Sequence, residues 1–321
     1  MKSLEPAFIS WCSFSNYTVK IISNSARLNY YVSRCSTSFI RIVPSPKGKH
    51  ADLEVYLNTL STLPEAPKNY KKITEADSQV GVFECYSDSR GGICLRNKSI
   101  YVIGNTHKGR CHLFFKELRF SRSVLINTLL LFLKHRGLFA LHSALVKRRN
   151  IGIMLPGESG VGKTTLAHNL RRRDFEYLCD DLCLLTRSNE KKVGVFPLDK
   201  DLSRNFFWYR KKGVHGKRAV KRFSGKRKTR KNKMVIPKVI IFPCISGGSK
   251  STLSLLPFPQ IFMRLIGSSL MMCFENKRMI NKHTQLLRDL ASQCACFELR
   301  AGTNKKETSK MLAKAISRLI K

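Results

Sequence analysis

The apolar residues of the first third of the chain come in short runs rich in β-branched and aromatic side chains. Residues 16–22 and 80–86 are such runs and predict strands, and turn glycines on either side of residues 99–103 predict another. No group of residues with catalytic character stands out there. We therefore expect a smaller β-rich region over residues 1–120.

The pattern changes after residue 120 to strands that alternate with helices. Ser121 or Ser123 is suited to cap a helix that runs to about Arg136 and ends at Gly137. Its apolar stretch, residues 124–133, is too short to span a bilayer and predicts a buried helix. Further along, strands are expected at residues 138–146, 151–155, 177–185 and 235–242, and helices at 163–172, 260–274 and 307–320. This order predicts an α/β domain over residues 121–321.

Composition adds a strong excess of positive charge. The 321 residues carry a formal net charge of +38, and 43% of them are hydrophobic, which is enough for one large or two modest cores. Such an excess favours anionic partners: phosphate-rich ligands, nucleic acid, an acidic peptide or an anionic membrane. Residues 210–233 hold 13 Lys or Arg among 24 residues without apolar periodicity, and we expect a mobile basic loop there.

The 11 cysteines are irregularly spaced and form no zinc-ligand pattern, so we expect reduced, mostly buried thiols. The N-terminal residues lack the apolar core of a signal peptide. Both observations predict a cytoplasmic protein without a membrane anchor.

A glycine-rich motif between a predicted strand and a predicted helix carries the clearest chemistry. Residues 157–164 fit the pattern G-x-x-x-x-G-K-[ST]. Its glycines let successive backbone N–H groups point at one anion, and the helix that follows directs its positive end to the same place. The Lys163 ammonium can bind the β- and γ-phosphates, and the Thr164 hydroxyl can ligate Mg²⁺. We therefore predict ATP and Mg²⁺ as cofactors. The expected nucleotide contacts are Gly157, Glu158, Ser159, Gly160, Val161, Gly162, Lys163, Thr164 and Thr165.

Two further positions flank this motif. Asp180 and Asp181 are the chain's only adjacent acids, and beside a phosphate loop they suit one magnesium ligand and one proton acceptor. A solvent-facing turn or a helix cap is the alternative for this pair. His142 lies in the strand that precedes the motif, where a lone histidine is more often a core residue than a functional one.

Together these segments resemble the catalytic domain of the HPr kinase/phosphorylase superfamily. The resemblance is carried by Leu-His-Ser-Ala-Leu-Val, then the phosphate loop, then Leu-Cys-Asp-Asp, and it covers residues 135–321, more weakly after 200. It implies a fold of the HPr kinase/phosphoenolpyruvate carboxykinase type. It also implies that Asp180 takes the proton from a substrate serine, that Asp181 and Thr164 lie on the magnesium side, and that His142 and Lys163 lie by the phosphates.

Departures from the family pattern narrow the activity that is expected of this chain. Thr165 stands where bifunctional members have glutamate, their Arg-Pro-Gly segment has no match, and only Glu190, Asp199 or Asp201 could replace their additional metal-side glutamate. A kinase is therefore favoured over a phosphorylase. The layout is similar to HPr-kinase-like proteins of peptide natural-product clusters, including lasso peptide precursor kinases.

The leading hypothesis is an ATP-dependent serine kinase whose acceptor is a peptide or small protein, acidic or a ribosomal natural-product precursor. Two alternatives stay open: a small-molecule hydroxyl kinase, and a nucleic-acid-associated NTPase or catalytically silent binding protein. The last is disfavoured because no aromatic residues interleave regularly with the basic run. Because family relatives often form rings, a homo-oligomer is also compatible with the resemblance.

Overall fold

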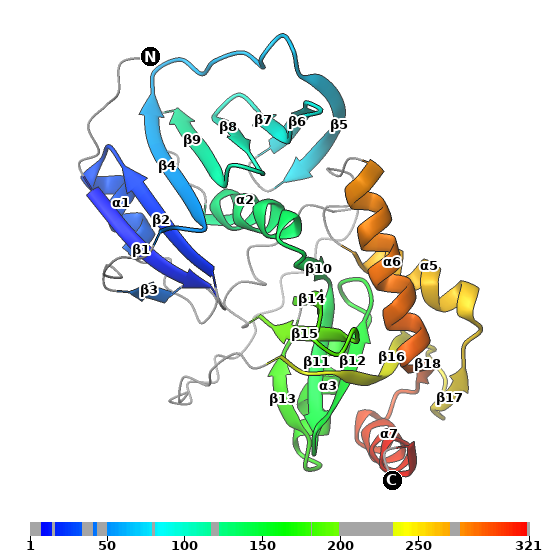
Figure 1. The fold of residues 1–321 in the computed structure, drawn as a ribbon. Coiled ribbons are helices and arrows are strands. Elements are labelled where there is room, and N and C mark those ends of the chain that lie inside the picture. The colour runs from blue at the N-terminus through cyan, green and yellow to red at the C-terminus, as the bar shows by residue number, and fades with distance from the viewer. Residues whose placement is uncertain are drawn as a thin grey trace.

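The computed structural model describes residues 8–14, 17–33, 41–43, 50–78, 81–116, 122–180, 182–198, 234–269 and 277–319. It has a large N-terminal sheet at one end and a mixed α/β unit at the other, with α2 (Arg122–His135) between them (Figure 1). Among the described residues, no helix is both long and apolar enough to cross a membrane. The expected basic loop at 210–233 lies outside the described residues.

The N-terminal sheet has nine strands in the order β3-β1-β2-β4-β9-β8-β7-β6-β5. Their bounds are β1 (Phe8–Phe14), β2 (Tyr17–Ser23), β3 (Arg41–Val43), β4 (Leu53–Leu60), β5 (Lys71–Ser78), β6 (Gly81–Ser87), β7 (Gly92–Arg96), β8 (Ile100–Asn105) and β9 (Arg110–Lys116). The three strands expected from the sequence correspond to β2, β6 and β8. A short helix, α1 (Ala26–Ser33), was not expected; its Leu28 and Val32 pack into the same core as β2 and β4.

Helix α2 is buried from Val124 to Lys134, as its mostly apolar stretch predicts, although Asn127 and Thr128 interrupt that stretch. Its side chains from Val124 to Leu133 share one core with the N-terminal sheet and with Leu138, Ala140 and Leu184 on the far side. One hydrophobic core therefore crosses the expected boundary near residue 120, so that α2 joins the two regions.

The second region contains two sheets. A small sheet has the order β10-β14-β15, and a six-stranded sheet has the order β13-β11-β12-β16-β18-β17. The strands are β10 (Phe139–Leu141), β11 (Ser143–Arg148), β12 (Ile151–Pro156), β13 (Glu176–Cys179), β14 (Cys183–Arg187), β15 (Val193–Pro197), β16 (Pro237–Ile245), β17 (Thr252–Leu255) and β18 (Ala295–Ala301). The helices are α3 (Lys163–Arg171), α5 (Phe258–Ser268), α6 (Lys277–Gln293) and α7 (Lys305–Leu319).

Alternating side chains cover the two faces of the six-stranded sheet. On β12, Ile153 and Leu155 pack with α3 and α7, whereas Met154 between them packs with α5, α6 and the small sheet. The central strands are apolar on both faces, which explains why their sequence shows continuous apolar runs instead of alternation.

Two strands expected as continuous are broken in the structure. The expected strand at 138–146 divides at His142, because β10 pairs with β14 in the small sheet while β11 pairs with β12 and β13. The expected strand at 177–185 divides into β13 and β14 for the same reason, and its break contains Asp180. The helix expected at 260–274 ends at Ser268, because Ser269 is extended and bridges to Leu141.

The end of α2 offers a test of backbone strain. Gly137 has φ 82°, and bonds from Gly137 N to Lys134 O and from Leu138 N to Leu133 O close the helix, as expected for a glycine stop signal. A Cβ at Gly137 or at Gly267 in α5 would meet nothing within 4 Å, so only the backbone conformation distinguishes the two positions.

Gly137→Ala is therefore expected to lower the free energy of unfolding by about 1 kcal/mol, the cost of a left-handed alanine. Gly267→Ala, in a helix and without a positive φ, is expected to raise it by roughly 0.5–1 kcal/mol. Denaturant titration of both variants measures the difference. Equal effects would contradict the strain argument.

Candidate functional site

Three predicted segments meet at one edge of the six-stranded sheet. Strand β11 lies between β12 and β13 and is antiparallel to both, with Ser143 opposite Pro156 and Leu145 opposite Cys179. The start of β11 and the ends of β12 and β13 therefore lie at the same edge. This places His142, the loop that begins at Gly157, and Asp180 beside one another, although the first and the last are 38 positions apart in the sequence.

The glycine-rich loop has a backbone suited to an anion. Gly157, Gly160 and Gly162 all have positive φ, at 149°, 94° and 95°. Helix α3 begins directly after Gly162, with no side-chain cap and no acidic residue in its first turn. N–H groups in the first turn of a helix lack intrahelical acceptors and carry partial positive charge. The loop and the helix thus form a positively polarised end.

Lys163 is the most enclosed charged group of this loop. Its side chain is 4% exposed, and its ammonium donates to the carbonyl oxygens of Gly157 and Glu158, each at 2.7 Å. The cation is therefore held over its own loop. Thr164 is half-buried beside it, whereas Glu158, Ser159, Gly160 and Thr165 are exposed and Val161 is half-buried.

His142 joins the loop to helix α5 through its backbone. Its N–H donates to Ser268 O at 2.8 Å, and its carbonyl accepts from Gly157 N at 3.3 Å. The half-buried histidine thus lies beside the first residue of the glycine-rich loop, rather than within a continuous strand.

Asp180 is buried, with 1% of its surface exposed, and accepts a hydrogen bond from the hydroxyl of Tyr177. Two cysteines lie on either side of Asp180 in the sequence: the sulfurs of Cys179 and Cys183 are 3.4 Å apart, and Cys183 contacts Ser143 O. Burial, reinforced by the neighbouring thiol, raises the pKa of Cys179 well above its ordinary value, so this thiol stays neutral. Of the described cysteines, only Cys244 is exposed and Cys294 half-buried, which confirms the expectation of mostly buried thiols.

Not every predicted site residue is described. Asp181, the expected magnesium ligand, lies outside the described residues, as do Asp199 and Asp201. Glu190 is described, but it is exposed and pairs with Lys192 at 2.8 Å on the surface. Within the ranges that the structure describes, no three acidic, histidine or cysteine side chains gather as a metal cluster. Mg²⁺ at phosphate loops needs few protein ligands because phosphate oxygens and waters supply the others.

A charged cluster that sequence reasoning missed lies further along the same sheet. Glu298 on β18 is opposite Phe242 on β16, and its carboxylate accepts from Arg264 of α5 at 2.5 Å and from Arg300 at 2.8 Å. The Arg264 guanidinium is 5.6 Å from the centroid of the Phe242 ring. Hydrogen bonds from the two arginines lower the pKa of Glu298. No sequence motif marked these residues, because three separate elements supply them.

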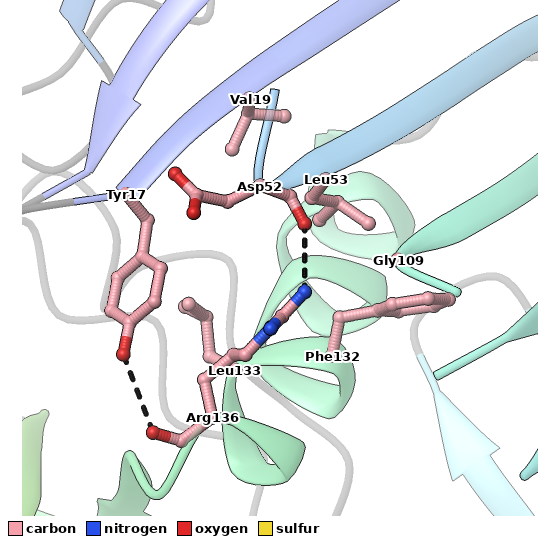
Figure 2. Close-up of a pocket in the computed structure, with 8 residues that line it drawn as sticks. All are labelled: Tyr17, Val19, Asp52, Leu53, Gly109, Phe132, Leu133 and Arg136. Atoms are coloured by element: carbon pink, nitrogen blue, oxygen red, sulfur yellow. Dashed lines mark hydrogen bonds between the residues drawn. The ribbon is translucent and has the colours of Figure 1, made fainter. Parts of the chain in front are cut away.

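A small cavity between the N-terminal sheet and α2 is too small to be a substrate site. Its volume is about 20 Å³, room for about one water molecule. Figure 2 shows the Tyr17 hydroxyl donating to Arg136 O and the Arg136 guanidinium donating to Asp52 O, at 3.3 and 3.1 Å. Gly109 lies against the same carbonyl, and a Cβ there would be 2.6 Å from it. These contacts fasten the end of α2 to the sheet and offer no room for a substrate.

Comparison with known proteins gives a partial relationship. No family model matches the chain. A protein of Oceanobacillus iheyensis named "Putative HPr kinase/phosphorylase 2" is 41% identical over 54 residues, which are 17% of this chain and 18% of that protein. The match thus spans less than a fifth of either chain. It supports a link to the HPr kinase/phosphorylase superfamily for part of this chain and agrees with a phosphotransferase activity.

Proposed function

We propose that this protein is an ATP-dependent kinase that phosphorylates a serine hydroxyl on a peptide or small protein. The observation that carries the proposal is the convergence of a glycine-rich loop, a buried lysine and a buried aspartate at one sheet edge. The partial match to a protein named as an HPr kinase/phosphorylase supports the same reaction class. We also propose a catalytic domain of the HPr kinase/phosphoenolpyruvate carboxykinase type over residues 121–321.

In the proposed reaction the loop amides and Lys163 hold the β- and γ-phosphates. Asp180 accepts the proton of the acceptor hydroxyl while the oxygen of that hydroxyl forms a bond to the γ-phosphorus. The bond from that phosphorus to the β–γ bridging oxygen breaks, so ADP leaves and the phosphoryl group stays on the acceptor. His142 lies where it can contact the transferring group. A Mg²⁺ held by Thr164 and Asp181 would neutralise phosphate charge.

Positive charge near the transferring group is also part of the proposal. Phosphoryl transfer depends on groups that stabilise negative charge on the equatorial oxygens. Lys163, the buried cation held against the glycine-rich loop, is the described residue that we propose for this role.

The direct test is incubation of the full chain with γ-labelled ATP and Mg²⁺ together with two kinds of acceptor. One kind is a panel of serine-containing peptides, acidic and neutral, and the other is free serine. We expect label on a peptide. Label on free serine alone would favour the small-molecule kinase, and absence of both label and ATP hydrolysis would exclude a kinase.

A nucleic-acid-associated NTPase predicts a different result. Binding to unrelated DNA would weaken steeply with salt, with a log–log slope set by the number of phosphates contacted. Stimulation of ATP hydrolysis by DNA, with no label transferred to any peptide, would favour that alternative over the proposed kinase.

A further inference from the structure

Tyr177 connects the buried acid to the face of the sheet that carries the phosphate-loop helix. Its half-buried ring lies on β13 and packs with the core formed by α3 and α7. Its hydroxyl donates to Oδ1 of Asp180, three residues further along the chain. Because the ring lies on the α3 side, the bonded carboxylate oxygen is directed toward that side as well.

A histidine of the phosphate-loop helix supports the ring of Tyr177. The rings of His168 and Tyr177 are stacked, with centroids 4.9 Å apart and planes 10° from parallel. His168 belongs to α3, which begins at Lys163. The helix that begins directly after the glycine-rich loop therefore also supports the tyrosine that bonds Asp180.

We infer that Tyr177 is a positioning residue that orients Asp180 toward the acceptor hydroxyl, with its ring fixed by His168. This inference rests on the proposed kinase function. A carboxylate can take the acceptor proton in the transition state only when one oxygen lies within hydrogen-bond reach of it. The tyrosine bond occupies Oδ1 and so fixes the direction of the other oxygen, Oδ2.

A purely structural role is the competing explanation, since a buried carboxylate needs hydrogen-bond donors in any case. The two roles predict different effects of removing the Tyr177 hydroxyl on the balance between phosphorylated acceptor and free phosphate. A structural role lowers the amount of folded protein and reduces transfer to the acceptor and hydrolysis by water in proportion. A positioning role impairs transfer to the acceptor more than hydrolysis, because water needs less orientation than a bound hydroxyl.

The experiment compares Tyr177→Phe with wild type in the full chain, using the peptide that wild type labels best in the panel above. We expect the ratio of ATP hydrolysed to peptide phosphorylated to rise roughly tenfold, as for loss of one hydrogen bond to a charged group. Nucleotide affinity is expected to stay at the wild-type value, and the thermal unfolding midpoint verifies that the variant is folded at the assay temperature.

Tyr56→Phe is the matched control, because the Tyr56 hydroxyl also donates to a carboxylate, that of Glu54, but on the N-terminal sheet. Its ratio is expected to equal that of wild type. An unchanged ratio in folded Tyr177→Phe, with wild type active, would overturn the positioning role and leave the kinase standing. Failure of wild type to label any acceptor would instead overturn the proposed function and the positioning role with it.

Discussion

Replacing Asp180 by asparagine is expected to abolish phosphoryl transfer to the acceptor while nucleotide binding is largely preserved. Asparagine has nearly the same size as aspartate and can still accept a hydrogen bond from Tyr177, but it cannot take up the acceptor proton at neutral pH. Loss of a general base typically costs about 10²- to 10⁴-fold in rate. The measurements are turnover with labelled ATP and nucleotide affinity by equilibrium titration.

Asp289→Asn serves as the matched control for this change. Asp289 is an aspartate of α6 that pairs with Arg187 away from the site edge, and exposed ion pairs contribute little to stability. We expect its turnover to equal that of wild type. Unchanged turnover in Asp180→Asn would rule out the base role assigned to this residue, whatever the control shows.

The glycine-rich loop and its flanking elements could be predicted because their signals are local. An apolar run of strand length, a glycine motif and a helix start follow one another without a gap, and the structure has β12 and α3 there. Gly137 likewise ends α2 as expected, since a left-handed stop depends on the residue itself.

The breaks at His142 and Asp180 could not be predicted from local pattern. Apolar residues resume two positions after each, and what divides the strands is that β10 and β14 pair with each other in a separate sheet. Both breaks contain candidate site residues. The departure from a regular strand is thus what frees these residues from ladder pairing and brings them to the sheet edge.

Helix α6 was missed although its sequence carries a signal. Met279, His283, Leu286 and Leu290 recur at spacings of four, three and four and are all buried, which is an amphipathic helical pattern. The polar residues between them hide the pattern from a search for apolar runs. The role inferred for Tyr177 had no such signal, because it depends on the stacking of His168 from another element.

Lys163→Met is expected to weaken nucleotide binding at least tenfold and to reduce transfer by a further factor of roughly 10²–10³, the cost typical for loss of a group that stabilises transition-state charge. Methionine matches the length of the aliphatic chain but has no charge and no donors. It leaves the carbonyls of Gly157 and Glu158 without the ammonium that bonds them. Titration with nucleotide and single-turnover transfer measure the two effects separately.

Lys192→Met provides the control. Lys192 is exposed, and among the described acids it pairs with Glu190 on the surface. This variant is therefore expected to bind nucleotide and transfer phosphate as wild type does. Lys163→Arg is expected to resemble Lys163→Met, since a planar guanidinium does not fit a buried position shaped for a compact ammonium. Together with Asp180→Asn, these variants separate binding from chemistry: the lysine variant is impaired in both and the aspartate variant in transfer alone. Wild-type nucleotide affinity in Lys163→Met would place the phosphates elsewhere than the loop at Gly157–Thr164 and would remove the basis of the proposed reaction.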